Sequence, residues 1–223
     1  PNVNEKDASL DVKVEISNDA DKESKLIVRN DFFSPEGKLL QNNDQKIKLK
    51  ARQTLSTTYK PRKIANPQLW SPESPCLYKI STTIIDDKTG NLLDSQTTKT
   101  GLRFFAFDAQ KGFMLNGKPY KLRGTNRHQD QWPVGVALDD DAHRRDIQLM
   151  KDFGCNFIRI AHYPQDDALL EACDELGLLA WEEIPVIDMV PDNPQYDNNC
   201  EENLVEMIRQ HYNHTSVIAW GYM

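Results

Sequence analysis

The 223-residue chain has no long hydrophobic run, and no stretch approaches the roughly 20 apolar residues that a membrane helix requires. It has only four cysteines, which form no CxxC pair and no spacing typical of a metal site. Glycine-rich phosphate loops and nucleophile elbows are missing as well. We therefore expect a protein with no membrane span, no metal site and no cofactor.

The chain also has no basic stripe. Its 27 Lys and Arg are outnumbered by 34 Asp and Glu, for a net charge of −7. Without clustered positive charge there is little to neutralise phosphates, so a nucleic-acid partner is not expected. No signal peptide is visible, but "PNVNEKD" does not resemble a natural start, so the compartment stays open between cytoplasm, periplasm and secretion.

The first half of the chain is patterned as short β-strands. Residues 10–17, "LDVKVEIS", alternate strictly between apolar and polar, which predicts a half-buried strand. Further strand-like runs follow, separated by turn clusters at 34–38 and 86–91, and no helical stripe interrupts them before about residue 108. This pattern predicts an antiparallel β-sandwich of immunoglobulin type.

After residue 108 strands alternate with helices. Strands are predicted at 120–126, 156–161, 178–184 and 216–220, and helices at 139–154, 164–177 and 201–212. Repeated strand–helix–strand units indicate a parallel sheet with crossover helices. Polar residues gather just past the strand ends, where both a barrel and a doubly wound sheet place their chemistry, so the pattern alone does not choose between the two.

Four long stretches carry a more specific signal: "LWSPESPCLY" (69–78), "GFMLNGKPYKLRGTNRHQD" (112–130), "NFIRIAHYP" (156–164) and "NHTSVIAWGYM" (213–223). They resemble segments of glycoside hydrolase family 2, which contains β-galactosidases, β-glucuronidases and β-mannosidases, and they occur in the family's order. The resemblance implies an immunoglobulin-like β-sandwich over residues 1–108, followed over residues 109–223 by the first half of a (β/α)8 TIM barrel.

The resemblance further implies a retaining exo-β-glycosidase, most similar to a β-galactosidase, with a terminal β-linked sugar as substrate. In the family, the segment similar to "NHTSVIAWGYM" continues into Asn-Glu, and that glutamate is the acid/base; the nucleophile glutamate lies further on. Because retaining hydrolysis requires both carboxyl groups about 5 Å apart, we expect residues 1–223 alone to be inactive. A β-glucuronidase or β-mannosidase of the same family is the alternative enzyme.

Two residues of "NFIRIAHYP" are expected in the sugar site. Arg159 resembles the family arginine that hydrogen-bonds the nucleophile carboxylate, where a guanidinium would keep that carboxylate ionised and oriented. His162 resembles a histidine that lines the subsite for the terminal sugar. Without the resemblance, a surface ion pair and a structural histidine would be the simpler interpretations.

Other polar residues are expected nearby. His128 and Asp130 are similar to family residues that contact sugar hydroxyls, although an exposed Asx turn would also explain Asp130. Asn126 is a contact or a support. Glu182 and Glu183 point to opposite faces if they lie in one strand, so they cannot form a catalytic pair, and Glu183 is expected to support the site.

Two departures from the family pattern concern metal and specificity. "EEIPVID" replaces the Glu-x-His ligands of magnesium-dependent β-galactosidases, so no magnesium is expected there, and "RIAHYP" leaves the substrate subtype open. Among the tryptophans, Trp132 in the "DQWPVG" loop is a candidate sugar-stacking platform, whereas Trp70 and Trp181 fit a core.

A second class of function is a non-catalytic carbohydrate-binding or structural module carried by the sandwich. It is the weaker hypothesis, because the sandwich aromatics Phe32, Phe33, Tyr59 and Tyr78 lie within strand patterns and are expected in the core. Four strands do not close an eight-stranded barrel, so the isolated half-barrel is also expected to self-associate through its open edges.

Overall fold

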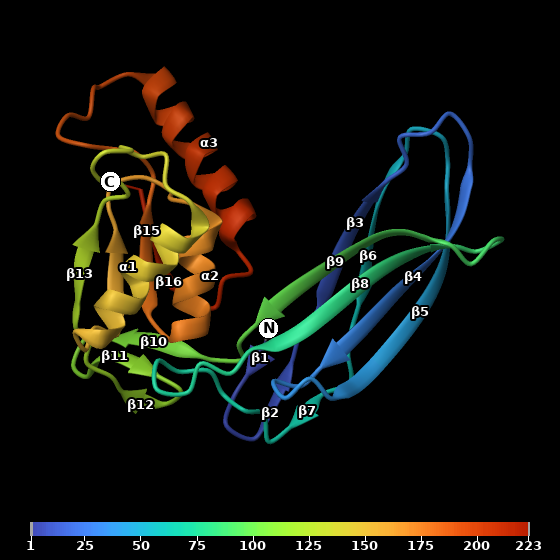
Figure 1. Cartoon of the computed structure of the whole chain (residues 1–223), viewed down its shortest axis with the longest axis horizontal. Coiled ribbons are helices and arrows are strands. Elements are labelled where there is room, and N and C mark those ends of the chain that lie inside the picture. Colours follow the sequence, from blue (N-terminus) through green and yellow to red (C-terminus); the bar gives the residue numbers. More distant parts are fainter. Residues whose placement is uncertain (1, 223) are drawn as a thin grey trace. The chain divides into compact units, whose positions relative to one another are not determined.

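The chain forms two compact units (Figure 1), seen here in a computed structural model that describes residues 2–222. The first unit runs to Leu69 and continues over Leu77–Leu102; the second contains Trp70–Cys76 and the chain from Arg103 onward. The predicted domains, residues 1–108 and 109–223, stay a prediction. None of the helices in residues 2–222 is long and apolar enough to cross a membrane.

The first unit is the predicted β-sandwich. Its larger sheet is antiparallel with the order β5-β4-β8-β9, formed by Leu39–Leu49, Ser24–Phe33, Tyr78–Asp86 and Leu92–Thr100. A second, antiparallel pair joins β3 (Val12–Ser17) to β6 (Thr54–Tyr59). A small sheet of order β1-β2-β7 comprises Asn2–Val3, Asp7–Ser9 and Ile64–Ala65.

Alternation along the strands builds the sandwich core. Ile16 of β3 is buried against Leu26 and Val28 of β4, and the intervening Glu15 is exposed, as the period of two predicts. Among the four aromatics expected in the core, Phe32, Tyr59 and Tyr78 are buried. Phe33 is partly exposed and lies beneath the Lys79 ammonium, 4.7 Å from the ring centroid.

The second unit contains the predicted half-barrel. Its parallel sheet has the order β13-β14-β15-β16, formed by Gly124–Arg127, Phe157–Ile160, Leu179–Glu183 and Val217–Gly221. The helices between them are α1 (Asp140–Asp152), α2 (Asp167–Leu176) and α3 (Pro194–His211). A small antiparallel sheet precedes them, with β10 (Phe105–Asp108), β11 (Gly112–Leu115) and β12 (Lys118–Pro119).

One apolar cluster joins this sheet to its helices. Ile147 of α1 and Leu169 of α2 are fully buried against Ile158 and Ile160 of β14, and Val217 of β16 belongs to the same cluster. Since side chains alternate along a strand, this packing leaves Arg159 on the opposite face of the sheet. In a closed (β/α)8 barrel, the face opposite the helices forms the interior.

The helix caps follow local sequence signals. The Asp139 carboxylate accepts a hydrogen bond from the Ala142 N–H at 2.8 Å, and Gly154 follows α1 with a φ of +83°. Gly177 caps α2 in the left-handed conformation. There a Cβ would lie 2.4 Å from the carbonyl oxygen of Pro72, so only glycine fits.

Three predicted boundaries were wrong. Helix α3 begins at Pro194 instead of residue 201, because Asn193 caps it and Pro194 starts it before any apolar stripe appears. Helix α2 begins at Asp167, after its cap Asp166. Strand β13 begins only at Gly124 instead of residue 120, because the Asn156 side chain takes hydrogen bonds that a strand neighbour would otherwise make: it donates to the Lys121 carbonyl (3.0 Å) and accepts from the Arg123 N–H (2.7 Å).

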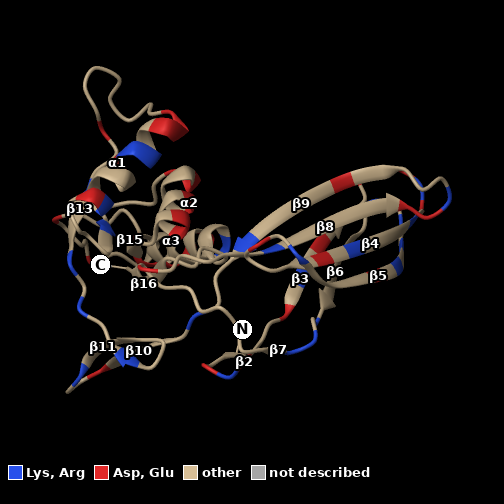
Figure 2. Cartoon of the chain, turned by 60° about the horizontal axis from the view of Figure 1, so that its bottom comes forward, with Lys and Arg blue, Asp and Glu red and all other residues tan. Residues whose placement is uncertain are grey.

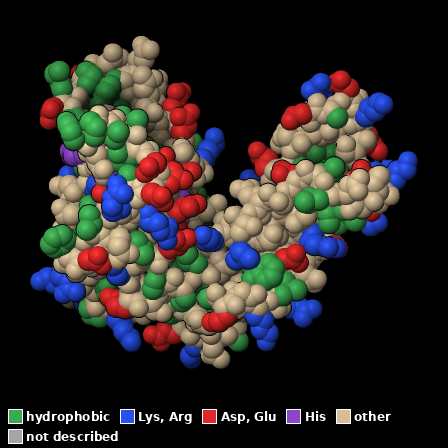
Figure 3. All heavy atoms as spheres, viewed as in Figure 1, with side chains coloured by type: hydrophobic (Ala, Val, Ile, Leu, Met, Phe, Trp, Pro, Cys, Tyr) green, Lys and Arg blue, Asp and Glu red, His purple; other side chains and the backbone are tan. Residues whose placement is uncertain are grey.

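Charge and apolar surface are distributed differently. Lys and Arg are interspersed with Asp and Glu along both units (Figure 2). Hydrophobic side chains gather at the upper end of the barrel unit in Figure 3. The loop between β15 and α3 exposes Ile187, Met189 and Val190.

Candidate functional site

The candidate site lies on the face of the parallel sheet that turns away from its helices. Asn126 of β13 pairs in register with Arg159 of β14, and Arg159 pairs with Trp181 of β15. Residues in register share a face, so these three side chains belong to one row near the carboxyl ends of the strands.

Arg159 and Glu183 form a two-pronged ion pair on this face. Arg159 Nε donates to Glu183 Oε1 at 2.5 Å and Nη2 donates to Oε2 at 3.1 Å. The Glu183 side chain is 5% exposed and that of Arg159 is 29% exposed. Bidentate arginine–carboxylate pairs combine strength with a fixed orientation, so Glu183 aims the guanidinium.

His162 joins the same pair. Its Nδ1 lies 3.1 Å from Arg159 Nη2 and 3.2 Å from Glu183 Oε2. In the tautomer with an unprotonated Nδ1, the imidazole accepts from Arg159; with a proton on Nδ1, it donates to Glu183. Either way Nδ1 is held by the pair, which leaves Nε2 as the nitrogen for a ligand.

His128 brings a second imidazole to this corner. The His128 and His162 ring centroids are 5.3 Å apart in a T-shaped arrangement, and the Tyr163 hydroxyl lies 3.4 Å from His128 Nδ1. The structure thus brings together Arg159, His162, His128 and Glu183 from three strand ends. The sequence predicts all four at one site.

The three remaining candidates are exposed. Asn126 is adjacent to Arg159 through the strand register, with an exposed side chain. Asp130 and Trp132 lie in the loop after β13, and the Trp132 side chain is 94% exposed. Within residues 2–222, no hydrogen bond or ion pair joins Asp130 or Trp132 to the Arg159 cluster, and their role in binding stays a prediction.

Glu182 and Glu183 point in opposite directions, as predicted. Glu182 faces the helices, where its Oε1 lies 2.7 Å from His211 Nδ1 of α3. His211 Nε2 also lies 2.9 Å from Asp167 Oδ1 of α2. Burial lowers the pKa of His211, but the carboxylates of Glu182 and Asp167 outweigh that effect and raise it above its ordinary value.

One tryptophan prediction was wrong. Trp70 is fully buried and donates from Nε1 to the Asp174 carbonyl oxygen at 2.8 Å, as a core residue should. Trp181 instead is half-buried, with the Arg159 guanidinium 5.1 Å from its ring. It lines a pocket of about 310 Å³ together with Ala219, Trp220, Gly221 and Tyr222. Trp181 and Glu183 are two residues apart in β15, so their side chains share one face of the sheet. This alternation could have predicted that Trp181 faces away from the helices.

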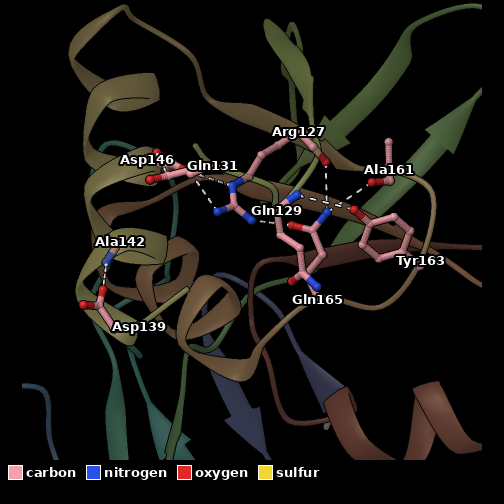
Figure 4. Close-up of polar contacts among 9 residues, drawn as sticks. All are labelled: Arg127, Gln129, Gln131, Asp139, Ala142, Asp146, Ala161, Tyr163 and Gln165. Atoms are coloured by element: carbon pink, nitrogen blue, oxygen red, sulfur yellow. Dashed lines mark hydrogen bonds and ion pairs between the residues drawn. The ribbon is translucent and has the colours of Figure 1, made fainter. Parts of the chain in front are cut away.

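A buried polar network behind the site was missed (Figure 4). Arg127 donates from Nε and Nη2 to Asp146 Oδ2 of α1, at 3.0 and 2.7 Å, and from Nη1 to Gln165 Oε1 at 2.5 Å. Gln131 Nε2 also donates to Asp146. Arg127 pairs in register with Ile160, which faces the helices. Because Arg127 follows Asn126 directly in β13, the alternation of side chains along the strand could have predicted that Arg127 faces the helices.

No metal centre is apparent in the described part of the chain: no three His, Cys, Asp or Glu side chains between residues 2 and 222 are grouped as ligands. What the face offers is a fixed guanidinium, two imidazoles and a half-buried indole. These groups donate hydrogen bonds to hydroxyls or a carboxylate and stack on an apolar ring face.

Known proteins are similar to this chain in sequence and in fold. The family model described as glycosyl hydrolases family 2, TIM barrel domain, matches residues 108–222, and the model described as glycosyl hydrolases family 2 matches residues 1–103. The structure of a β-glucuronidase from Bacteroides uniformis is 54% identical with a TM-score of 0.95, over 99% of this chain and 26% of that one.

Curated relatives are similar in the same way. A β-glucuronidase of Bacteroides fragilis is 40% identical over 169 residues, covering 72% of this chain and 24% of its own. A β-galactosidase of Thermoanaerobacter pseudethanolicus is 42% identical over 160 residues, covering 71% and 21%. The chain therefore spans about a quarter of the length of the relatives it matches.

Proposed function

The chain belongs to glycosyl hydrolase family 2, and from this we propose that it forms the β-sandwich and first barrel half of a retaining exo-β-glycosidase. In this proposal the face with Arg159 and His162 holds the terminal sugar. The observation that carries the proposal is the convergence of Arg159, Glu183, His162 and His128 at the carboxyl ends of β13, β14 and β15. Barrel enzymes build their sites at these strand ends.

Arg159 has a defined task in this scheme. Its Nε and Nη2 are engaged by Glu183, so Nη1 is the nitrogen that reaches a second carboxylate, that of the nucleophile. A guanidinium at that position stabilises the ionised form of the nucleophile, which must attack the anomeric carbon as an anion. His162 Nε2 and His128 contact hydroxyls of the same sugar.

The catalytic pair is proposed to come from elsewhere in the protein. Retaining hydrolysis uses two carboxyl groups about 5 Å apart on either side of the glycosidic bond. Glu183 is fully engaged by Arg159 and His162, and Glu182 faces α3, so neither serves as nucleophile or acid/base. We place both catalytic glutamates outside residues 2–222 and expect these residues alone to show no hydrolysis.

The substrate is proposed from the relatives. Solved β-glucuronidases of Bacteroides uniformis, 54% identical to this chain, favour a terminal β-glucuronide. The β-galactoside expected from the sequence is the second candidate, supported by the 42% identity to the Thermoanaerobacter β-galactosidase.

The test uses the full protein that contains this chain. It is assayed on 4-nitrophenyl β-D-glucuronide, β-D-galactoside and β-D-mannoside, and the first anomer released is identified by proton NMR. We expect hydrolysis of the glucuronide with the β-anomer formed first. Release of the α-anomer contradicts a retaining mechanism. Sugar binding without any hydrolysis would favour a non-catalytic module instead.

A further inference from the structure

The loops that carry His128 and His162 are joined by one buried amide. Gln165 Nε2 donates to the carbonyl oxygen of Arg127 at 2.9 Å and to that of Ala161 at 3.1 Å (Figure 4). These carbonyls belong to the residues immediately before the two histidines. Gln165 is 5% exposed, so solvent does not replace these hydrogen bonds.

The orientation of this amide is fixed by a neighbouring charge. Arg127 Nη1 donates to Gln165 Oε1 at 2.5 Å, while Asp146 holds the other side of the same guanidinium. If the amide were reversed, its NH2 group would face a guanidinium donor and its oxygen would face two carbonyl oxygens. The Arg127–Asp146 pair therefore selects the orientation in which both N–H groups of Gln165 point at the backbone.

A second contact spans the same gap. The Tyr163 hydroxyl lies 3.4 Å from His128 Nδ1 and 3.5 Å from the Gln129 backbone nitrogen. At the base of the gap, the Ala161 N–H donates to the Arg127 carbonyl at 3.1 Å and extends the strand ladder. Gln165 Nε2 differs from these contacts because it is a single donor shared by the carbonyl oxygens of Arg127 and Ala161.

We propose that Gln165 is a positioning residue that sets the separation of His128 and His162 by binding the backbone carbonyl next to each. The ring centroids of the two histidines are 5.3 Å apart. Each ring moves with its own backbone, so loss of the shared donor lets the two loops separate. The consequence of this separation for catalysis rests on the proposed function, in which both histidines contact the sugar. A misplacement of about 1 Å in groups that position a substrate costs up to 10²-fold in rate.

The test compares two variants of the full protein with one control. Gln165→Met keeps the size of the side chain and removes all its hydrogen bonds. Gln165→Glu keeps the oxygen that accepts from Arg127 and replaces the NH2 donor with a second oxygen, which faces the carbonyl oxygens of Arg127 and Ala161. Gln148→Met is the control: Gln148 is exposed on α1, and its Nε2 donates to Asp152 at 2.8 Å. Crystal structures give the His128–His162 separation, and kinetics on the glycoside that the wild type hydrolyses give kcat and KM.

We expect both Gln165 variants to fold and to show an altered His128–His162 separation, with kcat/KM reduced about 10- to 100-fold and the control unchanged. An unchanged ring separation in a folded Gln165 variant overturns the proposal. Loss of folding in both Gln165 variants also overturns it, because Gln165 is then a structural residue only. If the wild type hydrolyses no glycoside, the proposed function fails while the ring separation still decides the role of Gln165.

Discussion

Glu183 holds Arg159 with both carboxylate oxygens, at 2.5 and 3.1 Å, on the face of the sheet opposite the helices. The same Oε2 lies 3.2 Å from His162 Nδ1, so a single buried carboxylate organises two candidate sugar-binding residues. The arrangement explains why the chain has two adjacent glutamates at the end of β15. Glu183 binds Arg159 and lies against His162, whereas Glu182 contacts His211 of α3.

Glu183→Gln should lower the free energy of unfolding by about 2 kcal/mol, because it removes the negative charge from two hydrogen bonds made by Arg159. Urea unfolding followed by tryptophan fluorescence measures the change. Asp44→Asn is the matched control, since Arg29 binds Asp44 through the same two-pronged geometry but both side chains are more than 40% exposed. A change at Asp44 as large as that at Glu183 would contradict the account.

His211 should make the attachment of α3 dependent on pH. Its folded pKa is raised, with Glu182 and Asp167 as the carboxylates that face it and the His214 ring 5.8 Å away. Because the pKa of His211 is higher in the folded than in the unfolded protein, its protonated form stabilises the fold. This stabilisation is complete below the unfolded pKa, near 6.5, and is lost as the pH rises through the folded pKa.

Hydrogen exchange of the α3 amides, measured from pH 6 to pH 9, tests this prediction. After correction for intrinsic exchange rates, wild-type protection should exceed that of His211→Asn most at the acidic end, and the difference should shrink as the pH rises. A difference that grows with pH would show that neutral His211 is the stabilising form.

Gly221→Ala should disturb the site from β16. A Cβ there would lie 2.6 Å from Trp181 Nε1 and 2.8 Å from Glu183 Cγ, so the indole or the carboxylate must move. We expect a loss of about 1–3 kcal/mol in unfolding free energy. Combining the change with Trp181→Phe, which removes Nε1, should recover part of the loss. Purely additive effects in this double-mutant cycle would rule out the proposed contact.

The isolated 223-residue polypeptide should associate. In the described sheet, β13 and β16 are the outer strands, and each pairs on one side only within residues 2–222. Unpaired strand edges and an uncovered interior favour pairing between copies. Sedimentation velocity should show mass increasing with concentration. A compact monomer that melts in one cooperative transition would contradict this.

Sequence patterns predicted which segments form helices and strands better than they predicted where these begin and what they contact. The period of two in β3 depends on neighbours in the chain, so the local pattern was sufficient to predict that strand. The start of α3 was missed because its first turns are exposed and carry no apolar stripe.

The site residues also divide into those that the sequence predicted and those that it missed. The family resemblance pointed to Arg159 and His162, and the structure brings them together. The partners of Gln165 lie 38 and 4 residues away and meet it only through the fold. The partners of Arg127 were missed for the same reason, because Asp146 and Gln165 lie 19 and 38 residues away in the sequence.

The most direct test of the central claim is the hydrolysis rate of Arg159→Lys in the full protein, compared with wild type on the preferred aryl β-glycoside. Lysine keeps the charge but loses the planar fork that engages Glu183 and reaches the nucleophile. We predict a kcat reduced on the order of 100-fold with the fold intact. Unchanged kcat in a folded Arg159→Lys variant would show that this face is not the sugar site.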